Sequence, residues 1–532
     1  MRFLKIWIVS LVFTLSSFAG GFYENAIQHI VHSVKKSKSS ALKRVYSKLY
    51  YVPIWAGEEG ISYMAKYLFK HIHEDASISP TSNIATSLTS IEKLATTLYS
   101  SSSSTVAQKM DLELKITSLY YAYAQHALHG TIPWGSAKSR IRSRGGEWMT
   151  VKPPHNPISF LLASLRNGEF NFQATKPKNF NYMALEAQMK RYREYQKSGK
   201  WTKLPNFGSL RVGTQSAALP ALRERLKFMG DYGDCGNMRS TTSDKCIKNA
   251  LISFQKRHGL AVTGYVTKQT KKRLTESLES KIRTMSLNLD RIKWLTRKSY
   301  NKHVVINIPA FKLNFYSANK SIQTMRVITG KRKNPTPIFS DIVTTIVLNP
   351  YWNVPASILE KEMIVNLRRN PNYLKRKNMK LYSGWEGKTV DPSTVDWKQY
   401  KKGSKIPYRV AQLPGRGNAL GKIKFLFPNR FAVYMHDTPT KSLFKRTVRA
   451  FSHGCIRLQD PRGLLKTFAS FNKNINYSSA SKVLKSSTRR ALALNQKVPI
   501  DVVYLTAFVD EKGILNFRND IYSYDSYQLK SR

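Results

Sequence analysis

Acidic residues are scarce in this sequence. Its 532 residues include 32 Asp and Glu against 87 Lys and Arg, which gives a formal charge of +55 at pH 7. This imbalance excludes an acidic or neutral surface. It predicts anionic partners, which could be nucleic acid, an acidic membrane surface, or a polymer that carries carboxylates or phosphates.

Long hydrophobic runs are also missing. After the first twenty residues no segment reaches the apolar length of a transmembrane helix. The chain still has 42% hydrophobic residues, with nine Trp, 28 Tyr and 24 Phe, and this composition excludes a largely disordered or collagen-like chain. At roughly 150 residues per domain, the length predicts about three domains.

The N-terminus predicts export. Residues 1–5 are basic, residues 6–15 form an apolar run too short to span a bilayer, and Ser17-Phe18-Ala19 supplies a small-x-small cleavage site. We therefore predict a signal peptide over residues 1–19, with an uncleaved amphipathic anchor as the alternative. Export to the periplasm would remove nucleic acid as a partner and would turn the positive charge toward the cell wall or the envelope surface.

Cysteine is rare, with three residues in the chain. Cys235 and Cys246 lie 11 residues apart in a polar loop, which in an exported protein predicts a disulfide, with two free thiols as the alternative. Cys455 is then left without a partner. An odd cysteine in an oxidising compartment is a liability unless it is buried or used.

The periodicity divides the chain into a helical part and a β-rich part. From about residue 50 to residue 167, apolar residues recur at three- and four-residue steps, and a Ser-rich loop at 100–104 interrupts them. After residue 300 the pattern changes to strands, predicted at 303–308, 342–348, 431–435 and 500–508. The predicted fold class is multidomain α+β, with a helical scaffold domain over residues 45–200 and a β-rich domain over residues 300–528.

Two further segments stand out. The first contains helices, predicted near 183–195, at 219–228, at 247–258 and from Thr267. Residues 205–280 resemble the small three-helix peptidoglycan-binding domain of wall enzymes. In this unit Phe254 and Leu260 are expected in the core and Gly259 at a helix end. Residues 368–408 are polar, basic and aromatic and show no strand pattern. So long an excursion inside a compact domain is typical of a cover over a functional site.

The chemistry is concentrated in the stretch Ser452-His453-Gly454-Cys455-Ile456-Arg457. In an extended segment alternate side chains share a face, so His453, Cys455 and Arg457 are expected to point into one cleft. His453 would take the thiol proton, and backbone N–H groups of residues 453–455 would form an oxyanion hole. His436, on another predicted strand, would complete the wall. The alternatives are a zinc site, which lacks a fixed fourth ligand here, and a buried structural cysteine.

The segment from His436 to Arg457 resembles the active-site signature of the L,D-transpeptidases of the YkuD fold. Supporting stretches are residues 349–355, 414–421, 424–429 and 520–522. With the peptidoglycan-binding unit and the helical region before it, the chain is similar to the large multidomain YcbB-like subgroup over residues 45–528.

This resemblance implies a thioester mechanism on peptidoglycan stem peptides, with neither metal nor organic cofactor. Cys455 would attack the third residue of a stem, release D-alanine, and pass the acyl group to an amine of a neighbouring stem. His453 would be the base, while Ser452, Gly454 and His436 would support the site. Arg457 would fix the local structure or a substrate carboxylate. Tyr434 and Trp352 would line the substrate cleft, although either could equally be a core aromatic. Residues 368–408 would be the cap of the subgroup.

The expected function is therefore the formation of 3-3 cross-links, with stem peptides and glycan strands as partners. Two alternatives remain. Water could resolve the same thioester, which would make the protein an L,D-carboxypeptidase that trims tetrapeptides. A non-catalytic wall-binding protein would explain the charge but would leave the motif around Cys455 idle.

Overall fold

A computed structural model describes residues 20–370, 372–384 and 387–529. The predicted signal peptide lies outside the described residues. Among those residues, no helix is long and apolar enough to cross a membrane.

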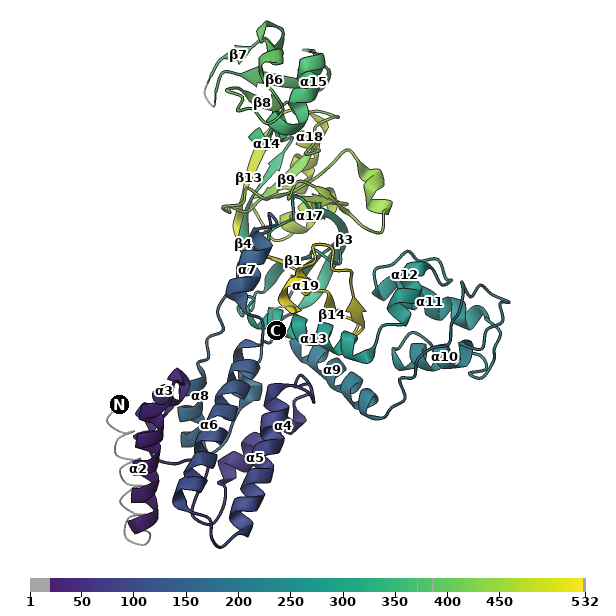
Figure 1. The fold of residues 1–532 in the computed structure, drawn as a ribbon. Helices are drawn as coiled ribbons and strands as arrows, with labels where there is room; N and C mark the ends of the chain where they lie inside the picture. Colours follow the sequence, from purple (N-terminus) through teal and green to yellow (C-terminus); the bar gives the residue numbers. More distant parts are fainter. Residues whose placement is uncertain (1–19, 371, 385–386, 530–532) are drawn as a thin grey trace.

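The N-terminal region is a bundle of helices, drawn in purple and blue in Figure 1. Its central helix carries the apolar positions that predicted it, and Leu112, Ile116 and Tyr120 are buried along one face. The predicted serine loop separates two of the helices. The bundle consists of α2 (Gly20–Lys36), α3 (Ser40–Leu49), α4 (Tyr63–Glu74), α5 (Asn83–Ser100), α6 (Val106–His129), α8 (Pro157–Asn167) and η1 (Phe172–Thr175).

One helix of this sequence region packs elsewhere. Residues of α7 (Trp134–Arg142) and the neighbouring Trp148 lie in the same hydrophobic core as the β-sheet described below. The bundle is joined to that sheet by α9 (Tyr182–Lys197) and by α13 (Leu278–Lys293), which packs on α9.

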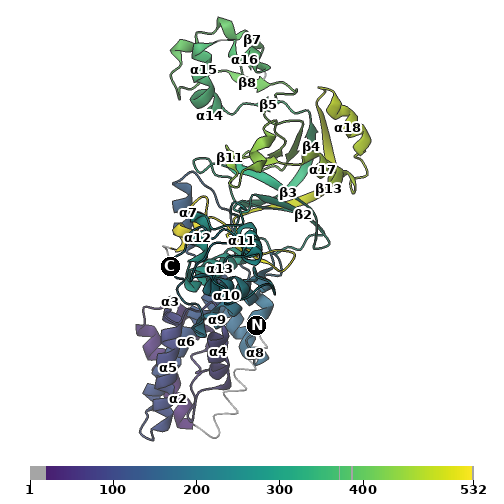
Figure 2. The same ribbon diagram turned by 90° about the vertical axis from the view of Figure 1, so that its right-hand side faces the viewer.

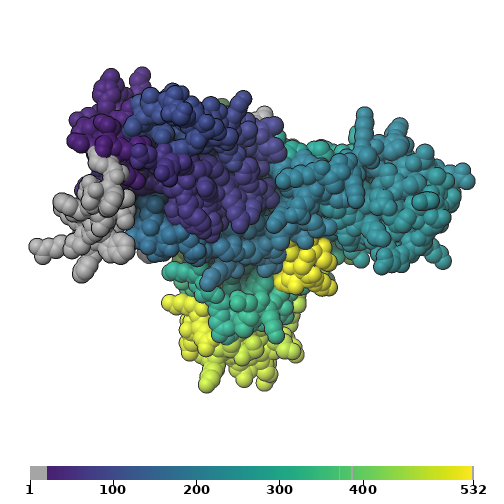
Figure 3. Space-filling model, turned by 90° about the horizontal axis from the view of Figure 1, so that it is seen from below, coloured from purple at the N-terminus to yellow at the C-terminus, as the bar shows by residue number. Residues whose placement is uncertain are grey.

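The three-helix unit is a separate lobe at the side of the molecule, seen from below in Figure 3. It contains α10 (Leu219–Phe228), α11 (Lys245–Arg257) and α12 (Lys268–Leu274). Phe254 and Leu260 are buried, and Gly259 ends α11 with a φ of 62°. A disulfide joins Cys235 to Cys246, whose Cα atoms are 5.9 Å apart.

The β-rich part is a nine-stranded sheet of order β11-β3-β12-β10-β9-β4-β13-β1-β2 that closes on itself, because β2 also pairs with β3. Its inward side chains, such as Val304, Ile346 and Ile500, form one core that α17 (Pro461–Ala469) and α18 (Tyr477–Lys485) cover. The strands are β1 (Lys302–Asn307), β2 (Lys312–Ser317), β3 (Lys320–Gly330), β4 (Phe339–Leu348), β9 (Ile423–Leu426), β10 (Met435–His436), β11 (Ala450–Ser452), β12 (Ile456–Leu458) and β13 (Arg490–Val503).

Two strand predictions need correction. The stretch 431–435 contributes only Met435 to β10, because Asn429 binds the backbone of residues 431 and 433 in a turn. The stretch 500–508 is divided between β13 and β14 (Ala507–Val509), which pairs with β15 (Leu515–Phe517).

The predicted excursion at 368–408 belongs to a larger subdomain with strands of its own. It begins at β5 (Trp352–Asn353), ends at β8 (Arg409–Gln412), and has a four-stranded sheet and a hydrophobic core around Leu367 and Trp397. Figures 1 and 2 show it as a lobe beyond one end of the main sheet, and we call residues 352–412 the cap. Its other elements are α14 (Ala356–Ile358), the π-helical turn η2 (Leu359–Met363), α15 (Ile364–Arg369), α16 (Tyr373–Arg376), β6 (Met379–Tyr382), β7 (Thr389–Val390), η3 (Pro392–Thr394) and η4 (Trp397–Gln399).

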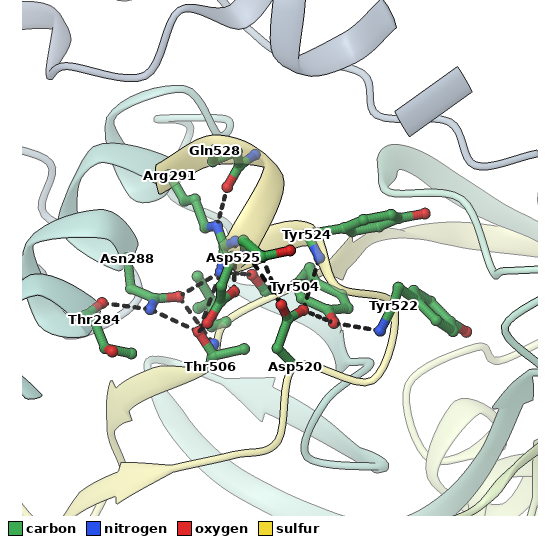
Figure 4. A network of polar contacts seen from close by, with 12 residues as sticks. Thr284, Asn288, Arg291, Tyr504, Thr506, Asp520, Tyr522, Tyr524, Asp525 and Gln528 are labelled. Atoms are coloured by element: carbon green, nitrogen blue, oxygen red, sulfur yellow. Dashed lines mark hydrogen bonds and ion pairs between the residues drawn. The ribbon is translucent and has the colours of Figure 1, made fainter. Parts of the chain in front are cut away.

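A buried polar network fastens the C-terminal segment to α13 (Figure 4). Arg291 of α13 binds Asp525 at 2.7 Å and Gln528 at 2.8 Å, both in α19 (Tyr524–Leu529). Asp520 accepts the hydroxyl of Tyr504 at 2.6 Å. Because Tyr522 of the same segment also contacts Thr336 and Gly330, which lie beside the motif around Cys455, the network supports one side of the candidate site described next.

Candidate active site

We expected His453, Cys455 and Arg457 to lie on one extended strand. In the structure they do not. β11 ends at Ser452 and β12 begins at Ile456, and a tight turn separates them. Gly454 has a φ of 118° in this turn, a conformation that favours glycine. The shared face of residues 453 and 455 therefore does not follow from strand geometry.

The strand pairing places a different set of side chains around Cys455. β10 and β12 are parallel, with Met435 opposite Ile456, and both of these residues are buried in the core. The residues that alternate with them point to the other face of the sheet. That face carries His436 of β10, Arg457 of β12 and Lys424 of β9, which pairs with His436. Tyr434 and Cys455 directly precede β10 and β12, and Cys455 interacts with Tyr434, Lys424 and Arg457.

The Cys455 thiol is half-buried, and its Sγ lies 3.9 Å from the carbonyl oxygen of Ala432. Burial raises the pKa of the thiol, while hydrogen bonds with Tyr434 and the charges of Lys424 and Arg457 lower it. Lys424 lies over the Tyr434 ring, 3.7 Å from its centroid. The positive charges of Lys424 and Arg457 can therefore stabilise the thiolate that forms when a base removes the proton.

His436 has the properties of such a base. Its Nδ1 lies 2.5 Å from the backbone oxygen of Asp437, and because a carbonyl only accepts, Nδ1 carries the proton and Nε2 a lone pair. No described residue hydrogen-bonds to Nε2. Burial and the charge of Arg457 lower the pKa of His436 to about 3, so the ring is neutral at physiological pH and Nε2 keeps its lone pair.

His453, the base predicted from the sequence, is turned toward the cap instead. Its Nε2 lies 2.7 Å from Oε1 of Glu362 and 3.0 Å from Nζ of Lys331. Among the described residues it makes no hydrogen bond to Cys455. The geometry therefore does not support His453 as the group that takes the thiol proton.

Ser452 and Gly454 hold the turn in place. The Ser452 hydroxyl donates to the backbone oxygen of Cys455 at 2.5 Å and accepts the N–H of Gly454 at 3.2 Å. Thr336 donates to the backbone oxygen of Gly454 at 2.8 Å. The N–H of Gly454 is thus occupied within the turn, which removes it from the predicted oxyanion hole.

The predicted substrate-binding residues occupy different places. Tyr434 is half-buried against Cys455, and burial raises the pKa of its hydroxyl. Arg457 is half-buried, and its Nε is buried with no hydrogen-bond partner among the described residues. Trp352 lies in β5 at the root of the cap and packs against the cap core.

Four residues that carry this geometry had no role assigned from the sequence: Lys424, Thr336, Lys331 and Glu362. Lys424 and Thr336 reach the site only through strand pairing and long-range contacts. Glu362 and Lys331 lie 91 and 122 residues from His453 in the chain. No local pattern marks Thr336, Lys331 or Glu362, and Lys424 stood only in the supporting stretch 424–429, without a role.

Other features of the described residues lie apart from Cys455. No group of three or more His, Cys, Asp or Glu residues among them is arranged to hold a metal. A cavity of about 810 Å³ opens beside β1 and β2, and none of the predicted site residues lines it.

Comparison with known proteins identifies the parts of the chain. Residues 301–473 match the family described as "L,D-transpeptidase catalytic domain", YkuD. The C-terminal domain is thus similar to the YkuD catalytic domain. Residues 40–189 match "Scaffold domain", and residues 215–274 match "Putative peptidoglycan binding domain". These matches confirm the resemblance and the fold class; the YcbB-like subgroup stays a prediction.

A relative of this chain occurs in Haemophilus influenzae. This "Putative L,D-transpeptidase" is 31% identical over 284 residues, which cover 52% of the chain and 56% of the relative's length. An L,D-transpeptidase structure from Stackebrandtia nassauensis aligns at 16% identity and a TM-score of 0.22, over 57% of this chain and 97% of that one. An L,D-transpeptidase structure from Mycobacterium smegmatis aligns at 15% identity and a TM-score of 0.19, over 38% of this chain and 58% of that one. Superpositions this loose support no statement about the site.

Proposed function

We propose that the protein is an L,D-transpeptidase that forms 3-3 cross-links between peptidoglycan stem peptides through a thioester on Cys455. The observation that carries this proposal is the arrangement around the thiol. A half-buried cysteine adjoins a sheet face that carries a neutral, buried histidine and two cations, in a domain similar to the YkuD catalytic domain. These are the parts that a cysteine nucleophile needs.

In the first step the thiol proton passes to Nε2 of His436. Sγ of Cys455 forms a bond to the carbonyl carbon of the third stem residue, the C–N bond to the terminal D-alanine breaks, and the proton leaves with the alanine amine. Lys424 and Arg457 stabilise the thiolate before the attack. This assignment replaces His453 by His436 as the base for the thiol.

In the second step an amine of a neighbouring stem attacks the thioester carbon. A C–N bond forms, the C–S bond breaks, and a proton of the attacking amine passes through His436 to the departing thiolate, which regenerates the thiol. Ser452 and Gly454 hold the turn that positions Cys455. Arg457 supplies a half-buried guanidinium for a substrate carboxylate, and Tyr434 forms the adjacent wall.

Hydrolysis of the same thioester is the alternative, because water can replace the amine. The architecture favours transfer: the peptidoglycan-binding domain can hold the polymer, and the cap contacts the motif through Glu362 and can exclude water. This domain set also supports the YcbB-like subgroup, action in the periplasm, and peptidoglycan rather than nucleic acid as the anionic partner.

Product analysis distinguishes the candidates. Purified protein is incubated with a disaccharide-tetrapeptide, and the products are identified by mass, with Cys455→Ala as the matched control. Cross-linked dimers and free D-alanine from the wild type alone are expected. Tripeptide alone would establish a carboxypeptidase. Wall binding that survives Cys455→Ala, with no wild-type turnover, would establish a binding protein.

A further inference from the structure

One of the few acidic residues of the chain touches the catalytic motif. Glu362 belongs to the π-helical turn η2 of the cap, and its carboxylate reaches across to His453, which follows β11 in the main sheet. With 32 acids against 87 bases in the sequence, an acid at this point is informative. Because His436 is the group placed to act on the thiol, the function of His453 is still open.

Glu362 and Lys331 compete for the same nitrogen of His453. Oε1 of Glu362 lies 2.7 Å from Nε2, and Nζ of Lys331 lies 3.0 Å from it. A neutral ring can donate from Nε2 to the carboxylate only when Nε2 carries the proton, and it can accept from the ammonium only when Nε2 carries the lone pair. The two contacts therefore favour opposite tautomers.

The contact is too weak to serve as a structural clamp for the cap. The side chains of Glu362 and His453 are 51% and 32% exposed, and exposed ion pairs contribute little to stability because solvent screens them. The cap has a hydrophobic core of its own and the pairing of β5 with β8 to hold its elements together. The effect of Glu362 is thus on the ring, where a carboxylate fixes which nitrogen bears the proton.

The tautomer that Glu362 favours leaves a lone pair on Nδ1. No described residue forms a hydrogen bond to Nδ1 of His453, and the ring is partly open to solvent. Nδ1 is consequently the nitrogen of His453 that can accept a proton, two residues before Cys455 in the chain. Lys331 is kept beside the motif by its own N–H, which donates to the backbone oxygen of Ser452 at 2.9 Å, and it opposes this tautomer.

We propose that Glu362 of the cap is a positioning residue that holds the proton of His453 on Nε2, so that Nδ1 deprotonates the incoming acceptor ammonium. The proposal rests on the proposed transpeptidase function. The ammonium loses one proton to Nδ1, the free amine attacks the thioester on Cys455, and the imidazolium beside Glu362 later releases its proton to water. Two histidines thus divide the reaction: His436 serves the thiol and His453 serves the acceptor.

The tautomer is measurable without any substrate. Full-length protein labelled with ¹⁵N-histidine is studied by NMR at pH 8.5, and His453→Gln identifies the signals. In the wild type the proton is expected on Nε2, and in Glu362→Gln it should move toward Nδ1 because Lys331 then prevails. Glu360→Gln is the matched control, since Glu360 lies on the same turn and its carboxylate has no described partner. A proton on Nδ1 in the wild type, or an identical tautomer in Glu362→Gln, would overturn the proposal.

Kinetics then separate the acceptor step from the donor step. Glu362→Gln should slow dimer formation from disaccharide-tetrapeptide tenfold or more, while acylation of Cys455 by a carbapenem, which needs no amine, should fall less than threefold. The double variant Glu362→Gln/Lys331→Met should recover at least threefold of the dimer rate, because the competing ammonium is gone. Equal losses in both reactions, or no recovery in the double variant, would contradict the tautomer argument.

A failure of this proposal differs from a failure of the proposed function. Wild-type protein that yields tripeptide only would refute transfer, and with it any acceptor. Wild-type dimers combined with an unimpaired Glu362→Gln variant would leave the transpeptidase in place and refute the role of Glu362 alone.

Discussion

At the scale of single residues, the Cys455 thiol is subject to opposing influences. Burial disfavours the thiolate, and the charges of Lys424 and Arg457 favour it. The balance leaves the pKa of the thiol above its ordinary value, so the reaction depends both on a base and on the nearby cations. Each of these dependencies can be tested by a separate substitution.

Replacing Lys424 by Met should slow acylation at neutral pH. Removal of the ammonium raises the pKa of the Cys455 thiol further, so the midpoint of the pH–rate profile should move to higher pH, and the rate at neutral pH should fall about tenfold for each pH unit that the midpoint moves. The measurement is carbapenem acylation followed by intact mass between pH 6 and 10. The control variant Lys445→Met removes an exposed lysine and should retain the wild-type profile. An unchanged profile in Lys424→Met would show that Lys424 does not act on the thiol.

The two histidines should differ in the same assay. His436→Ala should lower the acylation rate by roughly 10²–10⁴, the usual contribution of a general base, because its Nε2 is the available acceptor on the sheet face beside the thiol. His453→Ala should lose less than about tenfold, since its ring contacts Glu362 and Lys331. Cys455→Ala serves as the zero point. The reverse order of the two histidines would restore the assignment made from the sequence.

Residue types and spacing predict the members of the candidate site more directly than they predict its arrangement. The motif around Cys455 and the distant His436 could be read from residue types and spacing. The role of His453 could not, because it depends on the turn at Gly454 and on a carboxylate 91 residues away in the cap. Lys424 reaches the thiol only through the pairing of β9 with β10, which no local pattern encodes.

At the scale of elements, the buried acid Glu113 of helix α6 is expected to make the stability of the scaffold depend on pH. Glu113 accepts the backbone N–H groups of Ile54, Trp55 and Ala56 at 2.7–2.9 Å and the Tyr46 hydroxyl at 2.8 Å. These bonds lower its pKa, but burial has the larger effect and raises the pKa from 4.5 to about 7. The carboxyl is therefore protonated more readily in the folded than in the unfolded chain.

The scaffold should lose stability as the pH rises. A raised folded-state pKa means that the cost of the charged form is absent below about pH 4.5 and complete above about pH 7, which corresponds to about 3 kcal/mol. Hydrogen exchange at Trp55 and Ala56, corrected for intrinsic rates, should report a smaller opening free energy at pH 8 than at pH 5. Glu113→Gln should be less stable overall but nearly independent of pH; an equal slope in both proteins would assign the effect to another group.

Elements with strong local periodicity were predictable, while those set by long-range pairing were not. The helix at Leu219–Phe228 has the predicted bounds, because its apolar spacing and proline near the N-terminus are local signals. The cap was placed too late in the chain and without strands. Its strands are two to four residues long, and β5 pairs with β8 across nearly the whole subdomain.

At the scale of the whole molecule, charge and catalysis are separable. The +55 charge is spread over a chain of several lobes (Figure 1), whereas the reaction depends on a few cations beside Cys455. Exposed Lys and Arg act through a field screened within about 8 Å at physiological salt. Half-buried Lys424 and Arg457 are screened much less.

Salt should therefore weaken attachment to the wall more than it weakens chemistry. Raising the salt concentration from about 0.05 to 0.5 M shortens the screening length severalfold, so sedimentation of the protein with purified sacculi should decrease strongly. Turnover of a small soluble disaccharide-tetrapeptide should change by less than about twofold, because it needs only the partly buried groups around the thiol. Cys455→Ala should show the same salt-dependent sedimentation, since it keeps the charge and loses only the nucleophile. An equal collapse of binding and soluble turnover would show that exposed basic residues take part in the chemical step.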